Sequence, residues 1–255
     1  LPDWMAVPLT VVAVVGIINA INLIDGVNGL SSGYCITACT MFGTLFYLSG
    51  DMKMTILAAV SVGALIPFFL HNVFGKTSKM FIGDGGTLVM GVVITVFVIE
   101  TLRSGSSCGA YVEPRVGLVP FSLAVLCIPV FDTLRVMFSR ILRGVSPFRP
   151  DKTHLHHMFI NLGCSHAAVT LAIVALNTSV VLCWWGLTRL GVSIDVQLYA
   201  VVVMGFLVTF GLYHFMEWHL RRNTSFLRAV RRLGYRTHVS RRGVFLRMQH
   251  FLDRL

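Results

Sequence analysis

Long apolar segments alternate with short polar ones along most of this chain. Seven of the apolar segments approach the roughly 20 residues with which an α-helix crosses about 30 Å of hydrocarbon. They are Trp4–Leu23, Leu30–Ser49, Met54–Leu70, Gly85–Ile99, Val116–Leu134, Ala167–Thr188 and Val196–Met216. The pattern predicts an all-α fold, a polytopic transmembrane helical bundle of about seven spans that occupies residues 1–218.

The composition agrees with this pattern. The mean hydropathy is +0.77, and 55% of the 255 residues are hydrophobic while 13% are charged. A soluble domain of this size does not need so much apolar surface, so the bilayer is expected to be part of the solvent. The six cysteines form no CxxC pair and lie mainly in the apolar segments, where they are expected to pack as small apolar side chains.

The basic residues predict the orientation of the bundle. With seven spans the two ends lie on opposite sides, and one side then carries 17 Lys and Arg residues against 4 on the other. Because basic loops stay in the cytoplasm, we expect the N-terminus outside and the C-terminus inside. The cytoplasmic side then carries the loops at residues 25–32, 71–86 and 135–166.

The segment 219–255 is expected to be a basic cytoplasmic tail. Ten arginines lie between Arg221 and Arg254, interleaved with apolar residues such as Phe226 and Leu252. This pattern is typical of amphipathic helices that lie on anionic lipid headgroups. A nucleic-acid patch is the weaker interpretation next to a membrane span, so no nucleic-acid partner is expected.

The first polar group lies between the first two apolar segments. If the first helix continues, Asn19, Asn22 and Gly26 share one face, and Asp25 adds a carboxylate one turn past Asn22. The glycines of this stretch allow a tight turn or a close approach to a ligand. The alternative is that these residues only end a helix and begin a turn.

The second polar group, Phe81–Thr87, precedes the fourth apolar segment. Asp84 stands where a helix N-cap is expected, which is its structural interpretation. In the functional interpretation, the helix N-terminus and the glycine amides hold an anion, and Asp84 holds a divalent cation. Mg²⁺ suits this arrangement because it bridges carboxylates and phosphates through oxygen ligands.

The third polar group is the loop from Arg140 to His157, which includes the run PFRPDKTHLHH. Zinc ligation is one reading of its histidines, but no cysteine or second histidine pair has finger-like spacing. Imidazoles beside Arg149 and Lys152 are better explained as donors to phosphate oxygens. A basic loop that only sets topology does not explain three histidines in four positions. Asp132, just before this loop, either pairs with Arg135 or lines the same cavity.

Together these groups resemble the polyprenyl-phosphate N-acetylhexosamine-1-phosphate transferase superfamily. The matching segments are NAINLIDGVNGL at 19–30, FIGDGGTLVMG at 81–91 and PVFDTLRVMFSRILRGVSPFRPDKTHLHH at 129–157. The run PDKTHLHH is similar to the undecaprenyl-phosphate GlcNAc-1-phosphate transferase branch, within glycosyltransferase family 4. The peptidoglycan branch typically has three consecutive histidines after a proline, and this chain does not.

The resemblance implies an activity. It is the Mg²⁺-dependent transfer of an N-acetylhexosamine 1-phosphate to undecaprenyl phosphate. The expected group is GlcNAc-1-phosphate, and its expected donor is UDP-GlcNAc. The reaction is expected at the cytoplasmic face of a bacterial inner membrane. UMP is released and a cell-envelope polysaccharide such as O-antigen is begun. Mn²⁺ is the alternative metal. The alternative functions are a non-catalytic fragment and a membrane transporter or scaffold that binds lipid-linked anions.

The resemblance also implies roles for matched residues. The implied metal neighbours are Asn22 and Asp84. The implied catalytic residues are Asp25, Asp84 and His156. The implied substrate-binding residues are Asn28 (near the uracil), Arg149, Lys152, His154, His156 and His157.

Two departures from the family qualify these expectations. Asn28 stands where many bacterial members have Asp, which removes one negative charge from an anion-binding site. The family also carries an Asp-Asp pair in an earlier cytoplasmic loop, and this sequence has no adjacent aspartates. We therefore expect the chain to be the C-terminal part of a longer transferase and to be inactive by itself.

Overall fold

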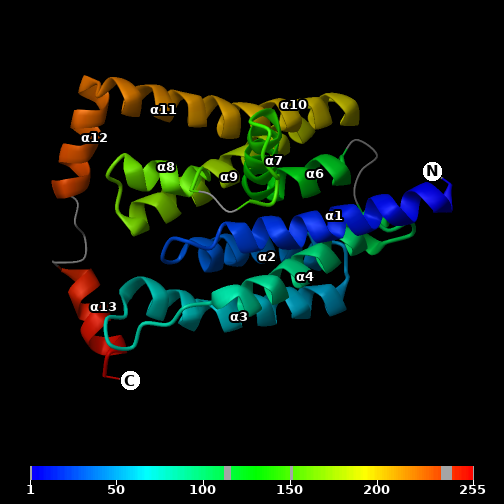
Figure 1. The fold of residues 1–255 in the computed structure, drawn as a ribbon. Helices are drawn as coiled ribbons and strands as arrows, with labels where there is room; N and C mark the ends of the chain where they lie inside the picture. Colours follow the sequence, from blue (N-terminus) through cyan, green and yellow to red (C-terminus); the bar gives the residue numbers. More distant parts are fainter. Residues whose placement is uncertain (1, 112–115, 150–151, 237–242, 255) are drawn as a thin grey trace.

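A computed structural model describes residues 2–111, 116–149, 152–236 and 243–254 of the chain, and within these ranges the fold is helical without strands (Figure 1). The helices are α1 (Asp3–Leu23), α2 (Leu30–Leu48), α3 (Met52–Phe74), α4 (Gly83–Leu102), α5 (Ser107–Tyr111), α6 (Leu118–Val125), α7 (Cys127–Leu142), α8 (Leu155–Asn161), α9 (His166–Arg189), α10 (Ile194–Phe206), a π-helical turn (Leu207–Gly211), α11 (Leu212–Arg222), α12 (Ser225–Arg236) and α13 (Val244–Leu252).

The predicted all-α membrane bundle is confirmed. Among the described residues, five helical segments are long and apolar enough to cross a bilayer, and the bent pair α6–α7 would be a sixth. The last of these segments runs without interruption from Ile194 to Arg222, through the π-helical turn. The remaining predicted span corresponds to α2, which has the length of a span but carries several Ser, Thr and Gly residues. Its buried face packs inside the bundle, where it does not need a fully lipid-compatible surface.

The predicted span at Val116–Leu134 is a bent pair of helices instead of one straight helix. The chain forms the eight-residue helix α6 and then turns by 71° into α7. Pro129 explains the break, because it has no N–H to donate to the carbonyl of Val125 four residues earlier.

Side chains from two other helices satisfy the backbone groups that this break exposes. The hydroxyl of Tyr34 on α2 and the Nδ2 atom of Asn177 on α9 both donate to the Val125 carbonyl at 2.8 Å. The Oδ1 atom of Asn177 accepts from the Ile128 N–H at 3.0 Å. Because no water is at hand in a packed membrane bundle, such partners are what allow a helix to break there.

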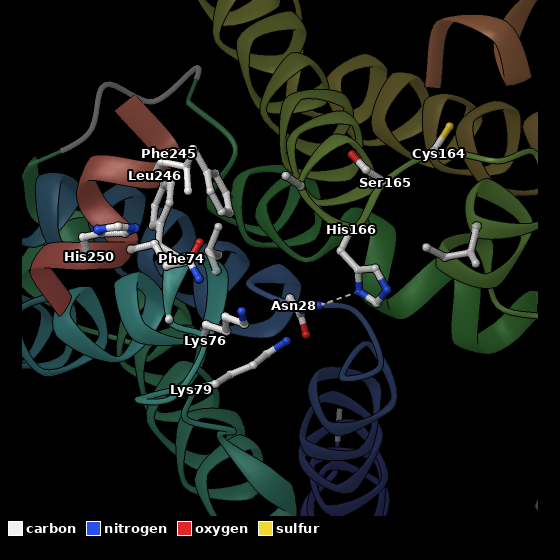
Figure 2. Close-up of a pocket in the computed structure, with 15 residues that line it drawn as sticks. Asn28, Phe74, Lys76, Lys79, Cys164, Ser165, His166, Phe245, Leu246 and His250 are labelled. Carbon is white, nitrogen blue, oxygen red and sulfur yellow. Dashed lines mark hydrogen bonds between the residues drawn. The ribbon is translucent and has the colours of Figure 1, made fainter. Parts of the chain in front are cut away.

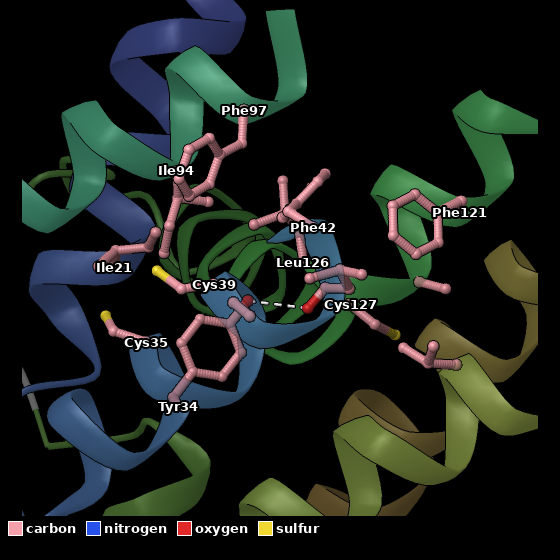
Figure 3. Close-up of a cluster of buried hydrophobic side chains, with 14 of the residues drawn as sticks. Ile21, Tyr34, Cys35, Cys39, Phe42, Ile94, Phe97, Phe121, Leu126 and Cys127 are labelled. Carbon is pink, nitrogen blue, oxygen red and sulfur yellow. Dashed lines mark hydrogen bonds between the residues drawn. The ribbon is translucent and has the colours of Figure 1, made fainter. Parts of the chain in front are cut away.

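Aromatic side chains and cysteines form the core around this break. The ring centroid of Phe42 lies 5.9 Å from that of Phe97 and 5.3 Å from that of Phe121, and Phe121 contacts Trp184 at 5.1 Å. Figure 3 shows these phenylalanines beside Tyr34, whose hydroxyl reaches the chain next to Cys127. The predicted packing role of the cysteines is confirmed for four of them, which are fully buried, whereas Cys164 is half-buried and Cys183 is exposed.

The turn at residues 24–29 and the loop at residues 75–82 lie at one end of the bundle, which we call the motif end (Figure 1). The helices α8, α12 and α13 lie at this end, and the start of α1 lies at the opposite end. The tail forms two helices, as expected for amphipathic segments, and each buries one leucine, Leu227 on α12 and Leu252 on α13.

Replacing Asn177 by Leu tests the stabilisation of the helix break. The substitution keeps the side-chain volume but leaves the Ile128 N–H without a partner and removes one of two donors to Val125. We expect the free energy of unfolding in detergent to fall by about 1–3 kcal/mol. The control is Ser179→Ala, an exposed position on the same helix whose hydroxyl bonds only to its own helix. Equal stability of the two variants would contradict this account.

Candidate active site

The first and second polar groups meet because α1 and α4 pack closely at the motif end. A Cβ atom on Gly91 would lie 2.9 Å from the Cα atom of Ile18, so only glycine allows this approach. Four residues further along each helix, in opposite directions, the hydroxyl of Thr87 donates to the Oδ1 atom of Asn22 at 2.5 Å. The packing of α1 on α4 therefore sets Asn22 beside the first turn of α4.

Asp84 lies in that first turn, one position after the helix begins. The helix starts at Gly83 with Ile82 as its N-cap, so the N-cap interpretation of Asp84 is wrong. Its side chain is exposed and forms no hydrogen bond or ion pair with the residues that the structure describes. The partial positive charge of the helix N-terminus favours the ionised carboxylate there.

The donor set near Asp84 fits a hard divalent cation. Thr87 follows Asp84 by three residues, so its partner Asn22 lies within about one helical turn of the carboxylate. The Asn22 carbonyl accepts one hydrogen bond and keeps a second lone pair. Among the described residues no three His, Cys, Asp or Glu side chains form a metal cluster. Protein oxygens would thus fill a minority of the coordination positions of the cation. Mg²⁺ is usually held in this way, because it keeps several of its water ligands.

The turn after α1 is fixed by hydrogen bonds from several elements. The helix does not continue to Gly26, because α1 ends at Leu23 and a turn follows, as the alternative interpretation expected. Ser31 donates to the carboxylate of Asp25 at 2.8 Å, which keeps this exposed carboxylate at the start of α2. The Asn72 side chain accepts from Gly29 N–H and donates to the Met80 carbonyl, so it joins the turn to the α3–α4 loop.

Asn28 is one of the residues that line a cavity of about 1010 Å³ (Figure 2). Its N–H lies 3.2 Å from Nδ1 of His166, and its carbonyl accepts from Thr170 at 2.9 Å, so α9 holds both backbone groups. Lys76 and Lys79 line the same cavity and extend toward Asn28. The cavity therefore combines amide, imidazole and ammonium groups, which suit an anionic ligand, with apolar walls such as Phe74 and Leu246.

Asp132 is the centre of a buried hydrogen-bond network. Its carboxylate is 2% exposed and accepts from Arg135 Nη2 at 2.7 Å, as the predicted ion pair requires. It also lies 2.9 Å from Nδ1 of His154 and accepts from the N–H of Leu155. Since a carboxylate can only accept, the Nδ1 atom of His154 carries the proton.

Arg135 extends this network to the third polar group and to α11. Its Nη2 atom also donates to the Thr153 carbonyl at 2.6 Å, and its guanidinium lies 4.0 Å from the ring centroid of Tyr213. The buried guanidinium thus donates from Nε and Nη2 to one carboxylate oxygen, donates to a carbonyl and packs on an aromatic face. The network therefore fixes the start of α8, where the histidines lie.

The three histidines form a stack that reaches the first polar group. The ring of His156 is nearly parallel to that of His154 at 5.8 Å and lies 4.2 Å from that of His157. A Cβ atom on Gly26 would be 2.9 Å from Nε2 of His156, so the ring rests on the backbone of the α1–α2 turn. The first and third polar groups are thus in direct contact.

His156 is held in its neutral form. Burial is the main cause that lowers its pKa from 6.5 to about 3, and the neighbouring His157 and His154 lower it further. A neutral imidazole donates one hydrogen bond and accepts one, so His156 can serve as a donor to phosphate without carrying a charge.

Arg149 and Lys152 are exposed and form no described contact with the other candidate residues. They flank Pro150 and Asp151, which lie outside the described residues. Arg140, itself buried, donates to the Pro147 carbonyl at 2.6 Å and thereby anchors the segment that leads to Arg149.

Several residues of this site were not found from the sequence. Thr87, Asn72, Arg140, His166 and Lys79 link the polar groups or line the cavity. Asn72 could have been recognised from the sequence, because a side-chain amide near the end of an apolar segment needs a polar partner. The others depend on contacts between distant helices.

Comparisons with known proteins point in one direction. Residues 1–102 match the model of glycosyl transferase family 4. The undecaprenyl-phosphate alpha-N-acetylglucosaminyl 1-phosphate transferase of Escherichia coli is 26% identical over 88% of this chain and 58% of its own length. The probable undecaprenyl-phosphate N-acetylglucosaminyl 1-phosphate transferase of Bacillus subtilis is 33% identical over 67% of this chain and 45% of its own length.

The undecaprenyl-phosphate alpha-N-acetylglucosaminyl 1-phosphate transferase of Haemophilus influenzae is 30% identical over 76% of this chain and 52% of its own length. The chain thus spans about half the length of these curated relatives. No solved structure matches it.

The low pKa of His156 predicts a pH dependence of stability. Below pH 6.5 the unfolded chain binds a proton at this position, whereas the folded chain does not until pH about 3. Stability should therefore fall as the pH drops through this window, with His156 contributing up to about 1.4 kcal/mol per pH unit. Unfolding in detergent between pH 7 and pH 4 measures it. The His156→Gln variant should have a shallower slope, and parallel curves for the two proteins would contradict the assignment.

Proposed function

The chain belongs to glycosyl transferase family 4, and from this premise we propose that it forms the catalytic face of a polyprenyl-phosphate sugar-phosphate transferase. The substrates we propose are UDP-GlcNAc and undecaprenyl phosphate, after the names of the relatives. One observation carries the proposal. The contacts Asn22–Thr87 and Gly26–His156 gather all three polar groups at one end of a membrane bundle.

The proposed reaction joins two phosphates. An oxygen of the lipid phosphate attacks the β-phosphorus of the nucleotide sugar, and a new P–O bond forms. The bond from the β-phosphorus to the oxygen that bridges it to the α-phosphorus breaks, and UMP leaves with the electron pair. A phosphate monoester has its second pKa near about 6, so at neutral pH the attacking group is largely a dianion and needs little help from a base.

The main task of the protein is then to offset the negative charge of two phosphate-bearing substrates. Lys76 and Lys79 in the cavity, with Arg149 and Lys152 on the neighbouring segment, supply positive charge. His156 and His157 supply imidazole groups, and Asn28, which lines the cavity, is the proposed contact for the uracil. The chemistry that Mg²⁺ supplies when held at Asn22 and Asp84 is neutralisation of phosphate charge.

We assign the motif end to the cytoplasmic side of a bacterial inner membrane. The excess of Lys and Arg on this side, 17 against 4, supports this orientation. The nucleotide sugar is then taken from the cytoplasm and the lipid phosphate from the inner leaflet. The arginines of α12 lie at the same end, where anionic headgroups are expected to contact them (Figure 1).

A transporter or scaffold that only binds lipid-linked anions is the second candidate. The glycines and prolines within the membrane spans of this chain are consistent with the broken helices of transporters, and the bend between α6 and α7 is one such break. The candidate polar residues gather at one end instead of at the midplane, which favours interfacial chemistry. Transfer of label from UDP-GlcNAc to extractable lipid separates the two functions, since a transporter or scaffold forms no labelled product.

Substitution of Asp84 tests the proposed metal site. In membranes that contain the protein as its gene encodes it, Asp84→Asn should lower the rate of label transfer at least 100-fold, because charge neutralisation is lost. Glu100→Gln is the matched control, since it removes a carboxylate at the far end of the same helix. Transfer at the normal rate by Asp84→Asn would exclude Asp84 from the metal site.

The contact between Gly26 and His156 provides a second test. The Cβ atom of Gly26→Ala would meet Nε2 of His156 at 2.9 Å, so the buried ring must shift. We expect at least a tenfold lower transfer rate, because a displaced donor is misaligned for the phosphate. Gly16→Ala is the control, since a Cβ atom there has nothing within 4 Å. If both variants transfer label equally well, His156 is not part of the reaction.

A further inference from the structure

Three consecutive backbone amides of the α3–α4 loop converge on one carboxylate oxygen. The N–H groups of Lys76, Thr77 and Ser78 all donate to Oδ1 of Asp253, at 3.0, 3.1 and 3.1 Å. The hydroxyl of Ser78 donates to the same atom at 2.8 Å. Successive amides that point at one centre form a concave anion site, which recognises an oxyanion by its charge and its lone pairs.

The carboxylate in this amide site comes from the other end of the sequence. Asp253 follows α13 directly, and hydrogen bonds from Ser78 and Lys76 lower its pKa well below the usual range of an aspartate. The ring of Phe245 on α13 packs against that of Phe74 on α3 at 4.8 Å. The amide site and this ring contact together hold α13 on the α3–α4 loop.

The docked helix also forms one wall of the cavity that contains Asn28. Phe245, Leu246 and His250 line the cavity on the same side as Phe74 and Lys76, and His166 lies across from them (Figure 2). Neither ammonium group forms an ion pair with a carboxylate in the part of the chain that the structure describes. The two ammonium groups in the cavity and the three converging amides beside it have more positive character than the single Asp253 carboxylate can neutralise.

We propose that the amides of Lys76–Ser78 are a phosphate-ester site, and that Asp253 occupies it as an intramolecular competitor which keeps α13 over the cavity. A phosphate oxygen accepts hydrogen bonds from the same amides and carries more charge than the carboxylate. Its binding releases Asp253, and α13 loses this hydrogen-bonded attachment while it keeps the apolar contacts of Phe245 and Leu252. The tail is thus a device that opens when a phosphate ester arrives.

The inference rests on the proposed function only for the source of the phosphate, which is either the lipid headgroup or the nucleotide. Lys76–Ser78 lie in the α3–α4 loop, six to eight residues before Asp84 in the first turn of α4, and the amide site shares no residue with the proposed metal neighbours Asn22 and Asp84. Binding measured in EDTA excludes any bridge through a metal at Asp84. The result is therefore independent of whether the protein transfers sugar phosphate.

Hydrogen exchange of the chain in lipid nanodiscs with EDTA tests the proposal. In the wild-type protein, inorganic phosphate should speed exchange of the α13 amides while residues 76–78 stay protected. In Asp253→Ala, residues 76–78 should exchange freely until phosphate restores their protection. This variant should bind phosphate about tenfold more tightly than the wild type, because the tethered competitor is gone. Asp195→Asn, an exposed carboxylate on another helix terminus, is the control and should behave as the wild type.

Separate samples with UDP and with undecaprenyl phosphate identify the source, since whichever ligand releases α13 carries the recognised phosphate. Ser78→Ala in the Asp253→Ala background is a second variant, and it should bind phosphate more weakly than Asp253→Ala because it removes one donor without a competitor present. The proposal is overturned if phosphate fails to protect residues 76–78 in Asp253→Ala, or if no phosphate ligand alters exchange of α13. The carboxylate would then be a structural attachment of the tail and nothing more.

Discussion

The carbonyl of Val125 lies inside the bundle and lacks its usual helical donor, because Pro129 has no N–H. Tyr34 and Asn177 donate to it instead. This substitution of side-chain donors for a backbone donor allows the chain to turn by 71° between α6 and α7. The turn gives α7 its direction, and α7 carries Asp132 three residues past the proline. Asp132 in turn holds His154, and the histidine stack extends from there to Gly26. A single helix break is therefore coupled to the position of the third polar group.

A second constraint fixes the other half of the site. Glycine at position 91 lets α1 and α4 approach, and the antiparallel register then pairs Asn22 with Thr87. The two constraints act on different helices but converge at the same turn, since His156 rests on a residue that follows α1. Buried groups set the positions, whereas the carboxylates of Asp25 and Asp84 remain exposed. This separation is useful for phosphate chemistry, because donors that are already oriented need not reorganise when charge develops.

The ends of the first two helices could be predicted well from the sequence, because strong turn formers mark them. The expected spans Trp4–Leu23 and Leu30–Ser49 differ from α1 and α2 by one residue at one end each. The bend at Leu126 could not be predicted, although Pro129 was visible. A proline in an apolar segment is also compatible with a kinked but continuous span, and the outcome depends on Asn177, which lies 49 residues or more from the groups it satisfies.

The same reasoning explains which site residues the sequence could indicate. Polar residues next to apolar segments are costly unless they have a use, so Asn22, Asp25, Asp84 and the histidines stand out from their neighbours. Lys76–Ser78 give no such signal, because their contribution is made by backbone amides that every residue type carries. Their role depends on a carboxylate 175 residues or more away in the sequence. The geometry of a site built from main-chain N–H groups depends on the conformation of the loop. Here the contact with Asp253 in the tail stabilises that conformation, and the carboxylate that the amides bind is the basis for proposing an anion site.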